Sequence, residues 1–209
     1  MIMVWALPFS GFAQYYFKHY KTDDGLVQNS VTAIIQDSKG LMWIGTRGGL
    51  NRFDGYTFRN IKNTKTKFGN IGNDNITALA EDKNGMLWIG TGRGIYRYNP
   101  YQETFVCLND LSHTYIDGVL VDDKNDVWFL ANARLYKYDQ VKKKVENKNI
   151  RASCMALDKT SENLWLGNDD GDVISYHIRK KTHSKIRLIN QGASAFRSIT
   201  TIRVVNSNE

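Results

Sequence analysis

The stretch LMWIGTRGGL, residues 41–50, returns as MLWIGTGRGI at residues 86–95, so the chain contains one ten-residue pattern twice. Shorter copies of it, DVWFL and NLWLG, occur at residues 126–130 and 163–167. The four copies are centred on tryptophans separated by 45, 40 and 37 residues, namely Trp43, Trp88, Trp128 and Trp165. A pattern that recurs with a period of about 40–45 residues indicates a repeated structural unit.

Each unit contains four short apolar runs separated by polar turns, as residues 31–61 illustrate with VTAIIQD, LMWIG, LNRFD and YTFRNI. Such runs of about four to seven residues, rich in β-branched and aromatic side chains, favour strands over helices. Asp37 and Gly40 stand where a hairpin needs a side-chain acceptor and a positive φ angle, and Asp82 and Gly85 repeat them in the next unit. Each unit is therefore expected to form four antiparallel strands.

Four antiparallel strands with a tryptophan, repeated every 40–45 residues or so, are typical of β-propeller blades. The sequence predicts an all-β protein with a β-propeller over residues 14–209, made of four complete four-stranded blades plus one strand of a fifth, in an incomplete ring. The blades are expected at about residues 30–61, 75–108, 115–147 and 152–188, with the start of a further blade at 198–205. Residues 15–20, YYFKHY, match the end of a blade, and in closed propellers such a strand commonly completes the last blade.

The residues that stay fixed between copies are those expected to pack one blade on the next. A four-stranded sheet leaves two apolar faces uncovered, so each blade must stack on its neighbours. A tryptophan contributes roughly 150–250 Å² of buried area to such stacking. A glycine two residues later shares the tryptophan's side of the strand and lets the next layer approach; these glycines are Gly45, Gly90 and Gly167. The third unit has Leu130 instead, so its packing is expected to differ.

The composition is that of a soluble globular protein, with 209 residues, 42% of them hydrophobic and 23% charged. The net charge is +7, but the longest basic clusters are KKK at 142–144 and RKK at 179–181, which argues against nucleic-acid binding. Cys107 and Cys154 fall at different points of the repeat, so we expect no disulfide and interpret both as small buried apolar residues.

The chain starts with MIMVWALPFSGFAQ, an apolar run that reaches the small-residue pattern Gly11-Phe12-Ala13. This pattern predicts a secretory signal peptide over residues 1–13, although it lacks the usual basic residue before the apolar run. A buried first strand is the alternative. No other stretch approaches the ~18 consecutive apolar residues of a membrane-spanning helix, so export without direct membrane insertion is expected.

The segments QDSKGLMWIGTRGGLNRFDGYTF and EDKNGMLWIGTGRGIYRYNP resemble the two-component regulator propeller repeat. The resemblance covers residues 15–205 and weakens in the third and fourth units. It implies the start of the periplasmic sensor region of a hybrid two-component system of the kind found in gut Bacteroidetes. In that family two seven-bladed propellers and a β-sandwich precede a spanning helix, a histidine kinase, a receiver and a DNA-binding domain. Members often sense oligosaccharides.

Strand order places the loops after the tryptophan strands, and those leading to each next inner strand, on one rim of a propeller. Propeller ligands usually bind at such a rim, over the central channel. The candidate ligand-binding residues on this rim are Arg47, Arg93, Arg134, Asp169 and Asp170. Arginine and aspartate side chains can hydrogen-bond pairs of sugar hydroxyls, and an acidic sugar would pair with arginine directly. The alternative is that all five are ordinary solvated loop residues.

Several short motifs suggest a catalytic or metal site, but the sequence around each of them does not fit such a site. GTGRG at 90–94 precedes a short strand and not a helix, NDDGD at 168–172 lacks the spaced ligands of a calcium loop, and no serine or cysteine sits in a nucleophile elbow. The histidines, His19, His113, His177 and His183, show no zinc spacing. We therefore expect no catalytic residue, metal or cofactor in this segment, which would not be an enzyme by itself.

The leading hypothesis is a periplasmic ligand-sensing segment that works by binding, with an oligosaccharide as ligand. Its other partners would be the remaining propeller blades or a second copy of the chain as a dimer, with no nucleic acid. The second hypothesis is a structural or protein-interaction propeller segment without a small ligand. A propeller enzyme, such as a lyase or a quinone-dependent dehydrogenase, is the third.

Overall fold

A computed structural model describes residues 16–61, 71–108, 111–187 and 198–205. Apart from one short 3-10 helix, η1 (Thr22–Asp24), its regular structure consists of strands. Within these ranges no helix is long and apolar enough to cross a membrane. The signal peptide expected over residues 1–13 lies outside the described residues.

The strands form four separate antiparallel sheets of four strands each. The first sheet contains β1 (Val31–Gln36), β2 (Met42–Thr46), β3 (Gly49–Phe53) and β4 (Phe58–Ile61). The second contains β5 (Ile76–Glu81), β6 (Leu87–Thr91), β7 (Gly94–Asn99) and β8 (Thr104–Cys107). The third contains β9 (Ile116–Val121), β10 (Val127–Ala131), β11 (Arg134–Asp139) and β12 (Lys144–Arg151). The fourth contains β13 (Cys154–Asp158), β14 (Asn163–Gly167), β15 (Asp172–His177) and β16 (Thr182–Arg187).

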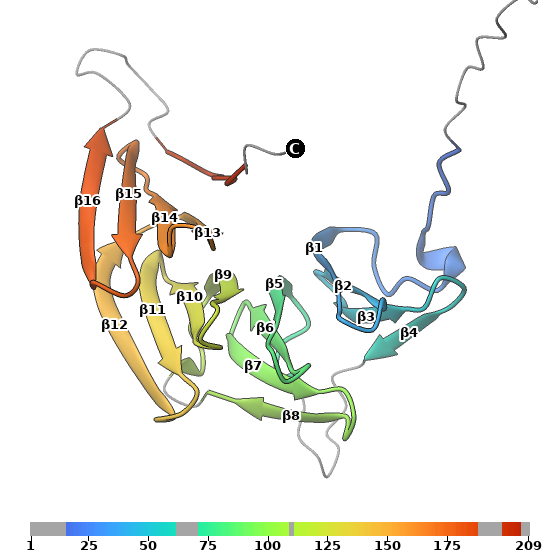
Figure 1. Ribbon diagram of the computed structural model, residues 1–209. Coiled ribbons are helices and arrows are strands. Elements are labelled where there is room, and N and C mark those ends of the chain that lie inside the picture. The colour runs from blue at the N-terminus through green and yellow to red at the C-terminus, as the bar shows by residue number, and fades with distance from the viewer. Residues whose placement is uncertain (1–15, 62–70, 109–110, 188–197, 206–209) are drawn as a thin grey trace, which may run out of the picture.

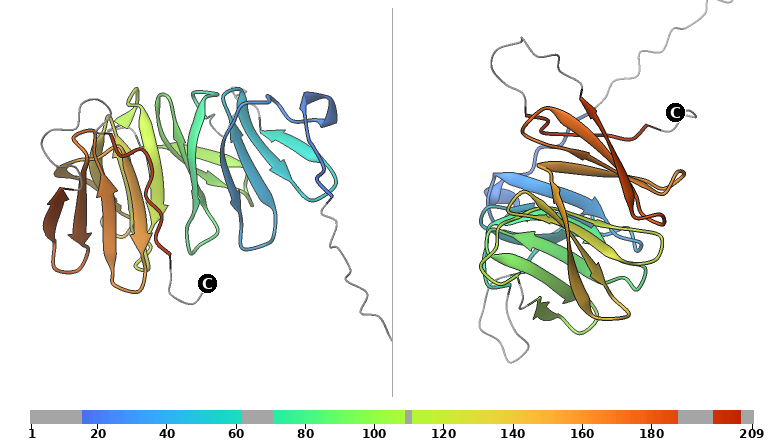
Figure 2. Two further views of the ribbon diagram at one scale, coloured as in Figure 1. Left: turned by 90° about the horizontal axis from the view of Figure 1, so that it is seen from above. Right: turned by 90° about the vertical axis from the view of Figure 1, so that its left-hand side faces the viewer.

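The sheets follow one another around a common centre, as blades of a propeller do (Figure 1). Their first strands, β1, β5, β9 and β13, lie nearest the centre, and the last strand of each sheet lies at the periphery. Seen from above, the four sheets stand side by side and their strands run between the same two rims (Figure 2). The all-β propeller architecture with four four-stranded blades is confirmed, whereas the incompleteness of the ring stays a prediction.

A carboxylate at each hairpin between the first and second strands fixes the tryptophan that follows. In the second blade, Oδ1 of Asp82 accepts the N–H groups of Asn84 at 2.9 Å and Met86 at 3.1 Å. Its Oδ2 accepts the indole N–H of Trp88 at 2.9 Å. The first and third blades repeat the indole bond at 2.8 Å, through Asp37–Trp43 and Asp122–Trp128. Gly40 and Gly85 have the positive φ angles, 86° and 71°, that these hairpins require.

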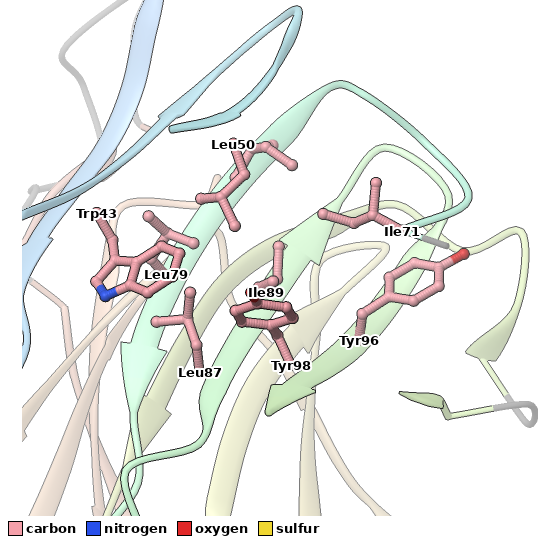
Figure 3. Close-up of a cluster of buried hydrophobic side chains, with 9 residues drawn as sticks. Trp43, Leu50, Ile71, Leu79, Leu87, Ile89, Tyr96 and Tyr98 are labelled. Carbon is pink, nitrogen blue, oxygen red and sulfur yellow. The ribbon is translucent and has the colours of Figure 1, made fainter. Parts of the chain in front are cut away.

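The core lies between the blades. Trp43 is 1% exposed and meets Tyr98 of the next blade with ring centroids 5.6 Å apart, beside Leu79 and Ile89 (Figure 3). The next two tryptophans make the same contact one blade further on, through the pairs Trp88–Tyr138 and Trp128–Tyr176. Each blade thus covers the apolar face of its neighbour, which a single sheet could not do for itself.

The glycines after the tryptophans allow this close stacking. A Cβ added to Gly45 would lie 2.5 Å from Cγ2 of Ile76, and one added to Gly90 would lie 2.8 Å from Cγ2 of Ile116, so neither position tolerates a side chain without movement. The third blade has Leu130 in place of this glycine, and its different packing was expected. Leu130 pairs with Gly118 on the inner strand, where the other blades place a larger residue opposite their glycine. In this blade the glycine of the pair is therefore on the inner strand, and the larger residue is on the tryptophan strand.

The fourth blade differs from the others on its outward face. Trp165 is only partly buried, because the described residues contain no sheet beyond it. Residues 198–205 form no regular strand, yet the N–H of Ile199 donates to the carbonyl of Asn168, and a Cβ on Gly167 would lie 2.5 Å from Cγ2 of Ile199. Ile199 therefore packs on Gly167 as Ile76 packs on Gly45.

Two further expectations concern particular residues. Residues 16–20 form no strand, and Tyr20 packs edge-on against Phe53 and Phe58 of the first blade; that this segment completes a last blade stays a prediction. Cys107 and Cys154 are free, as expected, but both are only partly buried because they occupy strand ends. Burial still raises the pKa of both thiols.

Candidate ligand site at the propeller rim

Polar side chains from all four blades surround an open cavity of about 450 Å³ at one mouth of the central channel. Three of them are the second residue of an inner strand, and Ser153, directly before β13, takes the corresponding position in the fourth blade: Thr32, Thr77, Asp117 and Ser153. The remaining lining residues come from the loops of the rim: Arg47, Asn75 and Tyr115. A second cavity of about 320 Å³ shares Thr77, Asp117 and Ser153 with it and continues along the inner strands. The size is that of a small-molecule pocket.

Backbone hydrogen bonds hold the two kinds of rim loop together. The N–H of Arg47 donates to the carbonyl of Ser30 at 3.2 Å, and the N–H of Gly92 donates to Asn75 at 2.9 Å. The N–H of Asn132 donates to the carbonyl of Tyr115 at 3.0 Å. In the first three blades the loop after the tryptophan strand is therefore tied to the segment that enters the inner strand. This supports the expected division of loops between the two rims.

A buried threonine shapes the first two of these loops. The hydroxyl of Thr46 donates to the carbonyl of Gly49 at 2.8 Å and accepts the N–H of Gly48 at 3.1 Å. Thr91 makes the same pair of bonds, to Gly94 and from Arg93. This is why threonine follows isoleucine and glycine in both copies of the opening pattern, while the two residues after it vary.

The three candidate arginines occupy three different positions of this loop, so they do not converge. Arg47 is the first residue after the strand and lines the cavity. Arg93 is the second residue of its loop, and Arg134 is already the first residue of β11. All three are exposed, but neither Arg93 nor Arg134 lines the cavity.

The two acidic candidates lie on the fourth blade, beside the cavity. Asp169 and Asp170 border a separate small hollow of about 30 Å³ with Arg151. Oδ1 of Asp169 accepts the hydroxyl of Ser198 at 2.8 Å. Asp169 also acts on the cavity itself, since its charge contributes to raising the pKa of Asp117. Asp170 has no such connection to the cavity.

Asp117 is the charged cavity residue that was not among the candidates expected from the sequence. Burial raises the pKa of its carboxyl group, the N–H of Ala133 lowers it through a 3.1 Å bond to Oδ2, and nearby Asp169 raises it again. The other cavity residues missed are Thr32, Asn75, Thr77, Tyr115 and Ser153. A signal was present, because the same position of the repeat, at the start of the apolar inner-strand run, is Thr, Thr, Asp and Ser in the four blades.

Within the described part of the chain, no group of three His, Cys, Asp or Glu side chains is arranged to hold a metal ion. The cavity instead offers hydroxyls, an amide, a phenol, one guanidinium and one carboxylate. Such a set can hydrogen-bond a polyhydroxylated molecule, and Tyr115, which is 45% exposed, presents an aromatic side chain at the mouth.

Comparison with known proteins agrees with the repeat pattern. The Two component regulator propeller family matches residues 25–48 and 70–93. Over 51 residues the chain is 49% identical to Histidine kinase P4 of Formosa agariphila, a match that covers 24% of this chain and 4% of that protein. The chain therefore corresponds to a small part of this relative.

Solved structures share the fold over most of the chain. The extracellular domain assigned to hybrid two component system BT3049 from B. thetaiotaomicron superposes with a TM-score of 0.68 at 20% identity, covering 81% of this chain and 26% of that one. Virginiamycin B lyase from Staphylococcus aureus superposes with a TM-score of 0.60 at 14% identity, covering 78% of this chain and 57% of that one. At these identities the likeness shows the propeller fold alone.

Proposed function

We propose that the chain, whose residues 25–48 and 70–93 match the two-component regulator propeller family, is a ligand-sensing segment of a two-component sensor. It acts in the periplasm, by binding and not by catalysis. The match to a histidine kinase and the likeness to the extracellular domain of a hybrid two-component system support this assignment. Any kinase activity would belong to parts of a longer protein.

The observation that carries the proposal is the 450 Å³ cavity at the rim, lined by polar side chains from four blades. The ligand it fits is an oligosaccharide. Hydroxyl-bearing rings match the array formed by Asn75, Asp117 and the forked donors of Arg47, and Tyr115 can cover the apolar face of a pyranose. Because the lining comes from several blades, a bound ligand would stabilise one arrangement of the blades over others, which is how binding can produce a signal.

The test is a thermal-melting screen of the purified chain against a panel of oligosaccharides, followed by affinity measurement for each glycan that shifts the melting temperature. A glycan present at 100 times its Kd should add about 2.7 kcal/mol to the free energy of unfolding. Arg47→Gln should weaken binding by about tenfold to a hundredfold, the range expected for losing a hydrogen bond to a charged group. Arg93→Gln is the matched control, since Arg93 is exposed on the same rim but lies outside the cavity.

A structural or protein-interaction role without a small ligand is the competing function. It predicts no shift with any glycan, and equal, negligible effects of the two arginine substitutions. That result would remove the sensing proposal and leave the fold intact.

A further inference from the structure

The position of the repeat shared by Thr32 and Ser153, at the start of the inner strand, has a structural role in two blades. The hydroxyl of Thr32 lies 3.0 Å from the carbonyl oxygen of Gly45 in its own blade and 2.6 Å from that of Ile76 in the next. Ser153 repeats the arrangement, at 3.2 Å from Gly167 and 2.7 Å from Ile199. In the first blade this hydroxyl therefore ties one blade to the next, and in the fourth it ties the blade to the segment at Ile199. The hydroxyl of Thr77, at the same position in the second blade, is buried and has no hydrogen-bond partner among the described residues.

Asp117 occupies the same position in the third blade and cannot make this tie when ionised, because a carboxylate has no hydrogen to donate. Its Oδ2 instead accepts the N–H of Ala133 at 3.1 Å. Among the described residues no lysine or arginine forms an ion pair with Asp117. The third blade thus lacks this hydrogen bond between blades and places an exposed carboxylate, without a cationic partner among the described residues, on the cavity.

The charges around the cavity are unevenly distributed. Arg47 belongs to the first blade, the neutral Asn75 and Thr77 to the second, and Asp117 to the third. Asp169, on the fourth blade, adds a second negative charge near Asp117. The carboxylate that lines the cavity and the one nearest to it therefore lie on the third and fourth blades, across from Arg47 of the first.

The carboxylate of Asp117 is exposed on the cavity wall, where a positively charged ligand group can form a charge-assisted hydrogen bond with it. We infer that the cavity takes an oligosaccharide with a free amino group, whose ammonium pairs with Asp117 while its hydroxyls bond toward Asn75 and Arg47. This inference rests on the proposed function and specifies its ligand class.

The experiment compares two probes of equal length, a β-1,4-linked glucosamine oligomer and its fully N-acetylated form, by calorimetric titration at a pH where the free amines are protonated. Both probes offer sugar rings and hydroxyls, but only the first carries positive charge. We expect the glucosamine oligomer to bind at least about tenfold more tightly, as for a hydrogen bond between charged groups. Asp117→Asn should abolish this preference, whereas Asp170→Asn, an exposed position outside the cavity, should leave it unchanged.

The melting temperature of Asp117→Asn, measured first, shows whether the variant is folded, and Asp117→Ser, which restores the hydroxyl of the other blades, serves as a second variant. Equal binding of the two probes, or a preference that survives in both folded variants, would overturn the inference about the amine. Binding of neutral oligosaccharides alone would do the same while leaving the sensing function in place. If no oligosaccharide bound at all, both proposals would fail together.

Discussion

The indole Nε1 of Trp128 donates a 2.8 Å hydrogen bond to Oδ2 of Asp122, six residues earlier in the chain. Oδ1 of the same carboxylate accepts the N–H groups of Lys124 and Asp126, both at 2.9 Å. The side chain of Asp122, which is 4% exposed, thus accepts hydrogen bonds both from the backbone of the hairpin and from the indole that packs against the next blade. The aspartate couples the local turn to the stacking of blades.

Replacing Asp122 with asparagine should destabilise the protein. The amide has one acceptor oxygen, so either the indole or the turn N–H groups must face its NH₂ group. Leaving a buried donor without an acceptor costs about 1–3 kcal/mol. Urea denaturation of Asp122→Asn should show a loss of this size in the free energy of unfolding. Asp123→Asn removes the same charge at the adjacent exposed position and should change stability by less than about 0.5 kcal/mol. Similar losses in both variants would contradict a special role for Asp122.

Gly90→Ala tests whether the glycine after the tryptophan is required for blade stacking. The added Cβ would lie 2.8 Å from Cγ2 and 3.2 Å from Cβ of Ile116, a branched side chain that is itself fully buried. Overpacking of this kind typically costs about 1–3 kcal/mol. Gly118→Ala is the control, because its Cβ would meet only the flexible end of Met155 at 3.4 Å. A Gly90→Ala variant as stable as Gly118→Ala would show that the blades can separate at no cost.

The sequence was sufficient to predict the fold because the packing residues are the repeated ones. Trp43, Trp88 and Trp128 recur, and so do the aspartates and glycines of their hairpins, since each blade must solve the same stacking problem. The exception at Leu130 could also have been explained from the sequence by considering the residue that pairs with it on the inner strand, because that residue is Gly118.

The site was harder to predict, because a cavity depends on the direction of side chains and not on their loop alone. Arg47 and Arg93 lie in equivalent loops and Arg134 begins the strand after the third such loop, yet a shift of one or two residues is enough to leave the side chain outside the cavity lining. Asp117 lies in a strand, where the alternation of apolar and polar residues predicts which side chains face the core but not which of them line a cavity. Asp117 has a carboxylate where Thr32 and Ser153 have a hydroxyl. This difference indicates a ligand site only once the structure shows that these residues line the same cavity.

Trp128 and Trp165 occupy equivalent positions with different surroundings. Trp128 is 1% exposed and contacts Tyr176, whereas Trp165 is only partly buried on the outward face of the fourth blade. Trp128→Phe should lower the free energy of unfolding by about 1–3 kcal/mol through the lost indole hydrogen bond alone. Trp165→Phe should cost clearly less, under about 1 kcal/mol, and should remove a fluorescence component that acrylamide quenches readily. Equal costs would mean that another layer covers Trp165 in solution.

Asp172 should make stability depend on pH in the acid range. Its carboxylate is fully buried, with Oδ2 2.5 Å from Nζ of Lys185 and Oδ1 3.2 Å from Nε of Arg187. The hydrogen bond from Lys185, and then those from Asn168 and Arg187, lower the pKa of Asp172 from 3.8 to about 2.

Because this pKa is lower in the folded state, the stabilisation from Asp172 is complete above the unfolded pKa near 3.8 and is lost as the pH falls toward about 2. The urea midpoint of the wild-type chain should therefore fall between about pH 4 and pH 2, and this part of the decline should be smaller in Asp172→Asn. Lys185 and Arg187 are half exposed, so 1 M NaCl should weaken the same contribution. Asp170→Asn, two residues away and exposed, should keep the wild-type pH profile. An unchanged profile in Asp172→Asn would show that the ion pairs with Lys185 and Arg187 do not persist in solution.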